Sequence, residues 1–495
     1  MEMLNASLKF LYGLFFSFTA AYLVITILSD AAALCRMDRD RREQFRKREL
    51  FSDGLFRELP VSILIPAHNE EASLCAGIRA LLRLDYPAYE IVVVNDGSTD
   101  RTLGTLLDSF PLKRAGMGRP KRLAARPVSA VYRCTVGGVP ITVLDKSAGG
   151  KADALNAGIN FCRYAHFAAV DADTVLPRDA MKRIAFPFLV RPETVACGGA
   201  VYTSKEFYAG ARVNALLLAF QKLEYLRAFY GLRLFFDRYH ANLIVSGAFG
   251  MFDRDTVARA GGYDTRTVGE DMELILRLHA YCRLCGKPYA ISYAPDAVCV
   301  TQFPLRIRDF CAQRRRWQTG LIQSLKKHRN AVSSRYFGAL GLLTAPVYCL
   351  YELAAPMIES LGILTLLLSR IAGVLDFQRV LFLTAGYAAV CLLSSWALAL
   401  GAAKLEHAPV RKGDLLPLLV AGFAEIFFFH FLYTAVRVYA TLTAQKFALR
   451  WEDQTRSVFS GAKETVVGFP RQPEVVGRRA PGASEFAAPS TGGLR

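Results

Sequence analysis

The sequence lacks the cysteine spacings that predict a disulfide framework or a zinc site. Its 11 cysteines include one CxxC pair, Cys282 and Cys285, and no second pair to complete a set of four ligands. Zinc-finger, homeodomain and RNA-recognition motifs are also missing, so nucleic acid is not expected as a partner. The simplest interpretation of these cysteines is a reduced domain that faces the cytosol.

Negative charge is scarce as well. The chain has 43 Asp and Glu against 61 Lys and Arg, a net charge of +18 over 495 residues. Such a balance suits anionic lipid headgroups or a phosphorylated substrate. Apolar residues make up 53% of the chain and are concentrated in the first thirty residues and in residues 338–442, a distribution that predicts a soluble domain flanked by membrane helices.

The N-terminal apolar run, Leu8 to Leu28, is long enough to cross a bilayer as a helix. It is followed by the basic segment RMDRDRREQFRKR, residues 36–48, whereas only Lys9 precedes the apolar core. The positive-inside rule then predicts a transmembrane helix within residues 1–35, an external N-terminus and a basic cytoplasmic linker over residues 36–60.

Three further apolar segments follow Trp317, at Leu342–Leu368, Val380–Leu400 and Leu415–Leu442, and predict membrane helices within residues 336–445. The basic loop 404–412 and the tail after Lys446 are both expected in the cytoplasm. The last segment is therefore predicted to be re-entrant or partly interfacial, with Glu425, His430 and Arg437 facing protein. Residues 457–495 are Pro-, Gly- and Ser-rich, and residues 446–495 are predicted to form a cytoplasmic, largely disordered tail.

Between Val61 and Phe303 the pattern changes to short β-rich runs that alternate with helical ones: VSILIP, EIVVVND, ITVLD and FAAVDAD. This alternation predicts an α/β fold with a parallel sheet. Residues 111–140 are rich in Pro, Gly and Arg, which indicates a surface insertion.

Carboxylates follow two of these runs, Asp96 after the second and Asp171 and Asp173 after the fourth. Carboxyl ends of parallel strands are where α/β sheets bind ligands. An Asp at one strand end is usually a turn former or a cap, but several on one edge favour a site. Alternate carboxylates such as Asp171 and Asp173 can converge on Mg²⁺ or Mn²⁺ and leave room for diphosphate oxygens.

Two more segments offer groups for sugar transfer. GGKADALNAGI, residues 149–159, opens a predicted helix with two glycines and Lys151, a combination that favours an anion. Further on, Glu270 and Asp271 stand at the start of an amphipathic helix, after the small-residue stretch SGAFGMF at 246–252. A helix cap would explain Asp271, but an inverting transfer needs one carboxylate as general base, and Asp271 is our candidate.

The motif QRRRW, residues 313–317, lies in a basic helical run before the last apolar segments. Helical spacing predicts that Gln313, Arg316 and Trp317 share one face, while Arg314 and Arg315 point elsewhere. That face would offer an amide, a guanidinium for a diphosphate and an indole ring for a sugar. The alternative interpretation is a basic patch that binds lipid headgroups.

Taken together, VVVNDGSTD, AVDADT, VGEDMEL and QRRRW, in this order, resemble the family 2 glycosyltransferases, in particular the membrane polysaccharide synthases for cellulose, chitin, hyaluronan and poly-N-acetylglucosamine. The resemblance implies a GT-A-like catalytic domain over residues 61–303, inserted between transmembrane helices, and an interfacial helix region over 304–335. It implies a nucleotide-sugar site made by Glu70, Asp96, Lys151 and Asp171, with His68 and Asn69 near the nucleotide. The metal would be held by Asp171 and Asp173, the base would be Asp271, and the acceptor and diphosphate would contact Glu270, Gln313, Arg316 and Trp317.

The expected function is an inverting, processive transferase that builds a β-linked polysaccharide from a UDP-sugar at the cytoplasmic face of a multi-pass membrane protein. The expected partners are the UDP-sugar donor, a glycan or lipid-linked acceptor and the bilayer. The sequence shows no clear counterpart of the gating loop of cellulose synthases and no cyclic-dinucleotide-binding domain after the membrane region, so cellulose is not favoured. A non-processive transferase acting on a lipid or lipid-linked acceptor remains an alternative, and a channel with an inactive transferase domain is disfavoured by the intact carboxylates.

Overall fold

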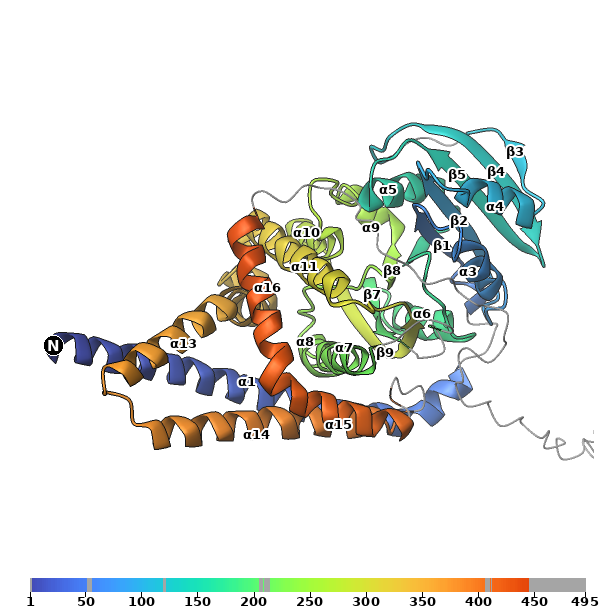
Figure 1. Ribbon diagram of the computed structural model, residues 1–495. Coiled ribbons are helices and arrows are strands. Elements are labelled where there is room, and N and C mark those ends of the chain that lie inside the picture. The colour runs from blue at the N-terminus through green and yellow to red at the C-terminus, as the bar shows by residue number, and fades with distance from the viewer. Residues whose placement is uncertain are drawn as a thin grey trace, which may run out of the picture.

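The structure is a computed structural model that describes residues 2–50, 56–118, 122–203, 208, 214–405, 410 and 412–444. It joins an α/β domain to a group of long apolar helices (Figure 1). The predicted disordered tail, residues 446–495, lies outside the described residues, as do positions 51–55 of the basic linker and 406–409 of the basic loop.

A nine-stranded mixed sheet forms the centre of the α/β domain, in the order β3-β4-β5-β2-β1-β6-β8-β7-β9. The four runs predicted as strands form its parallel core, in which β1 and β2 pair in parallel with each other, β2 also with β5, and β1 also with β6. Their bounds are Val61–Ala67 (β1), Tyr89–Asp96 (β2), Val139–Lys146 (β5) and His166–Val170 (β6). Beyond β6, β8 (Phe249–Asp253) is antiparallel to both neighbours, and β7 (Thr194–Tyr202) pairs in parallel with β9 (Ala290–Val300). The predicted α/β class is confirmed, but the sheet is mixed rather than parallel throughout.

The stretch 111–140 was predicted to be a surface insertion, but about half of it forms strands at the edge of the sheet. β4 (Val128–Val136) pairs antiparallel with β5 through a turn at Gly137 and Gly138, and β3 (Lys113–Ala115) pairs antiparallel with β4. Both turn glycines have positive φ, +58° and +83°, the backbone region that glycine enters without strain. Because β4 lies near the sheet edge and is half exposed, it has no continuous apolar run by which the sequence could reveal it.

The two faces of the central strands pack into separate cores, because successive side chains of a strand point to opposite faces. Ile63 and Ile65 belong to one core, and Leu64 belongs to the other. Helices on the first face include α3 (Leu74–Leu81), α4 (Thr102–Ser109) and α6 (Ala180–Val190). The second face is covered by α5 (Lys151–Phe161), α9 (Arg254–Arg259) and α10 (Glu270–Leu284).

Within the described part of the chain, four helical stretches are long and apolar enough to cross a membrane: Glu2–Arg42, Leu340–Ile371, Phe377–Ala402 and Leu415–Thr443. They cover the four apolar runs of the sequence. The first lies in α1 (Glu2–Leu50), and the third is α14 (Phe377–Ala402). The second joins η5 (Leu340–Thr344), α12 (Ala345–Val347), η6 (Tyr348–Ala354) and α13 (Ala355–Ile371).

The last stretch joins α15 (Leu415–Ala424), the π-helical segment η8 (Glu425–Phe429) and α16 (His430–Thr443). The helix changes direction at η8 (Figure 1), as helices do where π-helical turns interrupt the regular hydrogen bonds. A short 3-10 turn, η7 (Lys412–Asp414), precedes α15.

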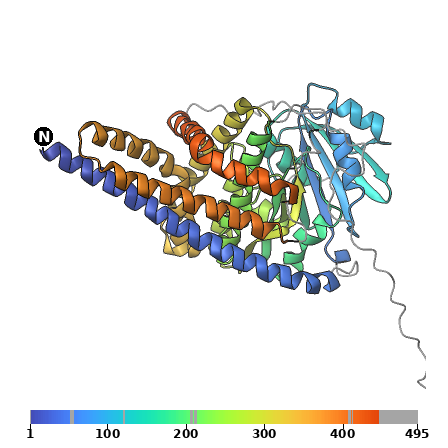
Figure 2. The ribbon, with the colours of Figure 1, turned by 60° about the horizontal axis from the view of Figure 1, so that its bottom comes forward.

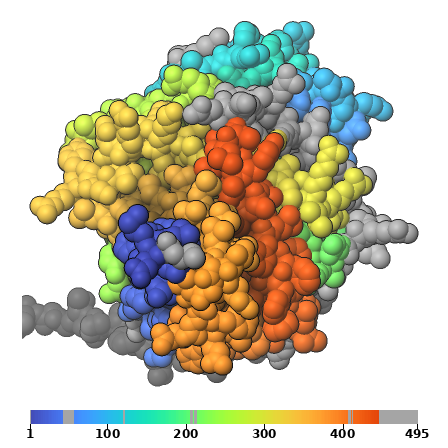
Figure 3. All heavy atoms as spheres, turned by 60° about the vertical axis from the view of Figure 1, so that its left-hand side comes forward, coloured from blue at the N-terminus to red at the C-terminus, as the bar shows by residue number. Residues whose placement is uncertain are grey.

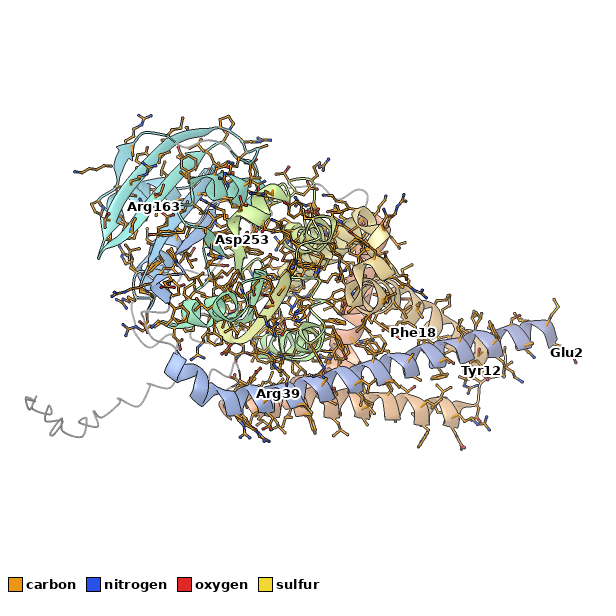
Figure 4. The ribbon with its side chains drawn as sticks, turned by 180° about the vertical axis from the view of Figure 1, so that it is seen from behind. Glu2, Tyr12, Phe18, Arg39, Arg163 and Asp253 are labelled. Atoms are coloured by element: carbon orange, nitrogen blue, oxygen red, sulfur yellow. The ribbon has the colours of Figure 1, made fainter. Side chains whose placement is uncertain are left out.

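The long helices lie together on one side of the molecule. Helix α1 packs along α13 and α14 (Figure 2), and the apolar helices lie next to one another on the face that Figure 3 shows. In Figure 4, Glu2, Tyr12 and Phe18 lie on the part of α1 that projects beyond the α/β domain, while Arg39 lies on the part alongside it. The α/β domain therefore meets the basic half of α1 and leaves its apolar half to the other long helices.

Two helices of the α/β domain connect the sheet to the long apolar helices. α7 (Ala215–Arg227), continued by η2 (Ala228–Leu232) and α8 (Arg233–Asp237), packs on α15, and α11 (Ile307–Lys327) packs along α16. Two 3-10 turns, η3 (Arg329–Ala331) and η4 (Arg335–Phe337), then lead from α11 to the apolar stretch that begins at Leu340.

Candidate active site

One cavity of about 680 Å³ extends from the carboxyl edge of the parallel strands to the long apolar helices, and its two ends are called the sheet end and the membrane end below. The site residues predicted from the sequence line it, with the exception of Asp96 and of His68 and Asn69, which were expected near the nucleotide. Those that line it are Glu70, Lys151, Asp171, Asp173, Glu270, Asp271, Gln313, Arg316 and Trp317. Residues that lie up to about 250 positions apart in the sequence thus face one space.

The carboxylates of Asp171 and Asp173 follow β6 and share their part of the cavity with Lys151, the first residue of α5. Lys151 Nζ lies 2.6 Å from Asp171 Oδ1 and 3.9 Å from Glu270 Oε1. Burial alone would lower the pKa of Lys151, but Asp171 and Glu270 outweigh it and raise this pKa above its usual value. The lysine is therefore charged and held among the carboxylates.

Asp173 is in a less favourable environment. Burial and the neighbouring Asp171 carboxylate raise the pKa of Asp173 to about 6, although Thr301 Oγ1 donates a hydrogen bond of 3.2 Å to its Oδ1. A carboxylate whose ionisation is opposed in this way is one of the usual marks of a ligand or catalytic site.

Glu270 and Asp271 begin α10 and face the same space. Asp271 Oδ2 accepts a hydrogen bond of 3.3 Å from the Gly247 amide, and Asp271 Oδ1 accepts one of 2.8 Å from the Met272 amide. Gly247 also links this carboxylate to Lys151, whose Nζ lies 3.5 Å from the Gly247 carbonyl oxygen. The small-residue stretch SGAFGMF thus contributes a turn at 246–248 before β8 and holds Asp271 by its backbone.

Glycines explain how closely the start of α10 approaches the QRRRW helix. A Cβ placed on Gly320 would lie 2.8 Å from the Gly269 Cα, and a Cβ on Gly269 would lie 2.8 Å from the Gly320 Cα. Neither position has room for a side chain. Gln323 adds a second link, because its Oε1 accepts hydrogen bonds from the Val268 amide at 2.9 Å and from Thr267 Oγ1 at 3.0 Å.

On α11, Gln313, Arg316 and Trp317 all line the cavity as predicted, and Trp317 is 40% exposed. The prediction that Arg314 points elsewhere is wrong. Arg314 is 1% exposed, lines the cavity, donates to Gln313 Oε1 and pairs with Glu224 at 2.5 Å. Its guanidinium carbon lies 4.2 Å from the centre of the Trp317 ring. The i, i+3 rule missed it because a long side chain can reach around the helix to a buried carboxylate on another element.

Asp96 is one of the predicted residues that lie outside the cavity wall. It is 1% exposed, and its carboxylate pairs with Lys146 and accepts hydrogen bonds from the backbone amides of Gly149 (3.0 and 3.1 Å) and Gly150 (2.7 Å). Lys146 also pairs with Asp153 at 2.6 Å. In this conformation Asp96 orders the turn that presents Lys151, and the predicted contact with a nucleotide stays a prediction.

The IPAHNE segment packs against the GST turn that follows Asp96. Asn69 has φ of +56° and accepts hydrogen bonds from Thr99 with its side-chain oxygen, while the ring of His68 lies 2.8 Å from the Asp96 carbonyl oxygen. Gly97 has φ of +61°. A Cβ placed on it would lie only 2.6 Å from the Ala148 amide nitrogen, so this position has no room for a side chain. Of the segment's last three residues, only Glu70 reaches the cavity.

The sequence predicts that Asp171 and Asp173 hold Mg²⁺ or Mn²⁺. Among the described residues, no set of three or more His, Cys, Asp and Glu side chains is placed to hold a metal ion. Asp171 and Asp173 nevertheless offer the oxygen atoms that hard cations prefer, and a cation would relieve the repulsion that raises the pKa of Asp173. The two carboxylates therefore fit a cation that takes its other ligands from a diphosphate and water.

At its other end the cavity is lined by aromatic rings and by ion pairs between helices. The rings include Tyr22, Tyr351 and Tyr387 from three different apolar helices. Arg227 pairs with Glu425, Arg437 Nη2 lies 3.0 Å from Glu352, and His430 Nε2 lies 3.3 Å from Glu359. The predicted orientation of Glu425, His430 and Arg437 toward protein is confirmed.

Sequence reasoning missed two groups that shape this cavity. Glu224 and Arg227, on α7, are the partners of Arg314 and Glu425, and both line the cavity. The acidic and basic residues inside apolar segments signalled that partners must exist, since a lone charge among apolar helices is costly. No spacing in the sequence indicated α7 as their source.

Residues 62–113 match the family model described as glycosyl transferase family 2, and residues 166–403 match the model described as glycosyl transferase family group 2. This chain carries glycosyltransferase family 2 domains. The first match runs from β1 to β3, and the second runs from β6 through the site to the end of α14, so the predicted membership is confirmed.

Curated relatives include poly-beta-1,6-N-acetyl-D-glucosamine synthases of two staphylococci. The protein from Staphylococcus epidermidis strain RP62A is 26% identical over 265 residues, which make up 52% of this chain and 54% of that protein. The one from Staphylococcus aureus strain COL is 25% identical over 260 residues, again 52% and 54%. The chain spans about half the length of the curated relatives it matches.

Among solved structures, a mannosyltransferase from Pyrobaculum calidifontis in complex with GDP-Man and Mn²⁺ has 21% identity and a TM-score of 0.47, covering 84% of this chain and 99% of that one. S. aureus TarS 1–349 in complex with UDP-GlcNAc has 12% identity and a TM-score of 0.36, covering 78% and 92%. Both TM-scores are below 0.5, so the fold assignment rests on the sheet order and the family matches.

Proposed function

We propose that this glycosyltransferase is an inverting, processive enzyme that adds sugars from a UDP-sugar to a growing β-linked chain at the cytoplasmic face of a membrane. The observation that carries the proposal is the single cavity, which runs from Asp171 and Asp271 past Trp317 to Tyr22 and Tyr387 on the apolar helices. An acceptor chain lying in this cavity would have its end at the carboxylates and its length among the helices. A lipid-linked acceptor of one or two sugars would not need the full path.

Asp271 is the general base in this scheme. Its carboxylate takes the proton of the acceptor hydroxyl, the hydroxyl oxygen forms a bond to the anomeric carbon, and the bond from that carbon to the diphosphate breaks, releasing UDP. Attack from the face opposite the leaving group inverts the anomeric configuration. Two backbone amides, those of Gly247 and Met272, fix the carboxylate for this role.

The donor diphosphate would lie between Lys151, on one side, and Arg316 of the QRRRW helix. A divalent cation held by Asp171 and Asp173, when bound, would neutralise charge on the departing diphosphate. Lys151 now contacts Asp171, so it has to turn from that carboxylate toward the diphosphate when donor and cation are bound. Asp96 acts one step away, by ordering the turn that carries Lys151.

Four apolar stretches and the basic segment after the first one support a multi-pass membrane protein whose glycosyltransferase domain is cytoplasmic. The names of the staphylococcal relatives make UDP-N-acetylglucosamine the first donor to test. The experiment incubates the purified full chain with a panel of labelled UDP-sugars and sizes the products. Polymers of many sugars from one donor are the expected result, whereas one or two sugars on a lipid would overturn processivity in favour of the lipid acceptor.

A further inference from the structure

A second cavity, of about 580 Å³, lies outside the candidate active site and has a basic lining. Four of the side chains that line it are basic, and one is acidic. The basic ones are Arg191, His240, Arg283 and Lys287, and the acidic one is Glu193. They come from the turn between α6 and β7, the turn after α8 and the end of α10, so the cavity is assembled by the fold and is not one basic run of sequence.

Two of its cations are available to a ligand. Arg191 and Lys287 are exposed, and neither has a salt bridge or a side-chain hydrogen bond within the described part of the chain. His240 lies among them with φ of +50°, a conformation that only a few per cent of non-glycine residues adopt. Burial and the charge of Arg191 lower the pKa of His240, so the positive charge of this cavity comes from its two arginines and its lysine, against one acidic side chain, Glu193.

Arg283 is held in place from two sides. Its Nε donates a hydrogen bond of 3.1 Å to the Tyr289 hydroxyl, and its Nη1 donates one of 2.7 Å to the Tyr336 carbonyl oxygen. The Tyr289 hydroxyl also lies 2.9 Å from His279 Nδ1. A guanidinium fixed in this way loses little freedom when it binds an anion, which is a favourable starting point for recognition.

The position of the cavity relates it to both the membrane and the active site. Tyr336, one wall, belongs to η4, which ends three residues before the apolar stretch that begins at Leu340. Arg283 belongs to the last turn of α10, and the other end of the same helix carries Glu270 and Asp271. A ligand bound to Arg283 therefore contacts the helix whose other end carries the proposed base.

We propose that this cavity binds a phosphate group, supplied either by the headgroup of an anionic lipid or by a soluble phosphate compound. Arg191 and Lys287 supply the charge, and Arg283 supplies a guanidinium of fixed orientation. Oxygen atoms that carry full or partial negative charge are the natural partners of such a set. The site is independent of the proposed polysaccharide product, because none of its residues lines the large cavity.

The test uses the purified full chain in a neutral detergent and measures its thermal unfolding midpoint. The probes are inorganic phosphate and short-chain phosphatidylglycerol, each compared with chloride of equal ionic strength and with short-chain phosphatidylcholine. The variant is Arg191→Gln with Lys287→Gln. The matched control is Lys113→Gln with Arg133→Gln, which removes the same charge from exposed positions that face each other on β3 and β4.

A probe at 100 times its dissociation constant should raise the midpoint measurably in the parent and in the control, and the double variant should lose most of that rise. A rise with both probes identifies the phosphate group itself as the ligand, while a rise with the lipid alone identifies a headgroup. Either result supports the site. The proposal is overturned if neither probe raises the midpoint of the parent, or if the double variant responds as strongly as the control, since the response then comes from net charge or from the donor site.

Discussion

At the sheet end of the large cavity four carboxylates, those of Asp171, Asp173, Glu270 and Asp271, gather around Lys151, whereas at the membrane end three acids each lie against a basic partner. The different arrangement of charges at the two ends has a physical cause. Charges among apolar helices persist when they are paired, because an unpaired charge is costly there. Carboxylates that repel one another are found where they can bind a ligand or take part in catalysis. Changes at the sheet end should therefore affect rate without a loss of stability, and changes at the membrane end should lower stability.

Removal of divalent cations should have the largest effect. In excess chelator we expect turnover to stop, because Asp171 and Asp173 would then repel the donor diphosphate, and it should return when Mg²⁺ or Mn²⁺ is added. UDP release from a UDP-sugar measures this directly. Full turnover in chelator would contradict the assignment of these carboxylates to a cation.

Asp271→Asn should have the second-largest effect. Loss of a general base typically lowers the rate by ~10²–10⁴-fold, and the amide preserves the volume of the side chain. We expect kcat to fall within that range while the Kd of UDP, measured by calorimetry, stays near that of the parent. If UDP affinity falls in parallel with the rate, Asp271 is a nucleotide or structural residue instead.

Arg227→Ala should instead act on stability, because it leaves Glu425 without its partner in the cavity wall. Breaking a fully buried pair costs 3–5 kcal/mol, and since Arg227 is about one third exposed to the cavity we expect a loss of about 2 kcal/mol.

The unfolding midpoint in detergent measures this loss, and Arg259→Ala is the matched control because it breaks the solvent-exposed Arg259–Asp255 pair, a change expected to cost less than about 1 kcal/mol. Equal shifts in the two variants would remove the distinction between the cavity wall and the surface.

Asp173→Asn should stabilise the chelator-treated protein at pH 7.5. The pKa of Asp173 is raised from 3.8 to about 6, so the folded state binds this proton more tightly than the unfolded state does, and ionisation lowers stability as pH rises from about 4 to 6.

The amide removes that penalty, which we expect to be on the order of 1 kcal/mol, and the gain should vanish below pH 4. Asp108→Asn, at an exposed position, is the control and should show no such pH dependence. A loss of stability in Asp173→Asn at pH 7.5 would count against repulsion at the sheet end.

Trp317→Ala should have the smallest energetic effect and act on product length. Stacking of a sugar on this ring should be worth about 1 kcal/mol, enough to change how often a chain escapes between additions. Products should shorten more than consumption of UDP-sugar slows. Tyr239→Ala, an exposed aromatic outside the cavity, should change neither quantity. Unchanged product length in Trp317→Ala would remove Trp317 from the chain path.

The sequence predicted the parts of this molecule that repeat a local pattern. Continuous apolar runs marked β1, β2, β5 and β6, since strands covered on both faces need such runs. Long apolar segments marked the membrane helices. Carboxylates after strands marked Asp171 and Asp173, and a helix start marked Glu270 and Asp271.

The other features of the fold and the site depend on contacts between residues that are far apart in the sequence. No local spacing of residues predicts such contacts. The sequence contains Gly269 and Gly320, but nothing in it says that these two glycines touch. Likewise, Arg314 lies beside Glu224 because α7 and α11 pack together, and Asp96 is buried because Lys146 and the Gly149 turn close over it. Half-exposed strands such as β4 have too weak a pattern to separate them from loops.

The most direct test of the central claim, that one cavity joins the chemistry to the membrane helices, uses the parent chain in sealed vesicles with the catalytic domain outside. Labelled UDP-sugar is added outside, and the product is then exposed to an added glycoside hydrolase before and after detergent. The account predicts a long polymer that resists the hydrolase until detergent opens the vesicles. A product that is digested without detergent, or that consists of one or two sugars on extractable lipid, would contradict it.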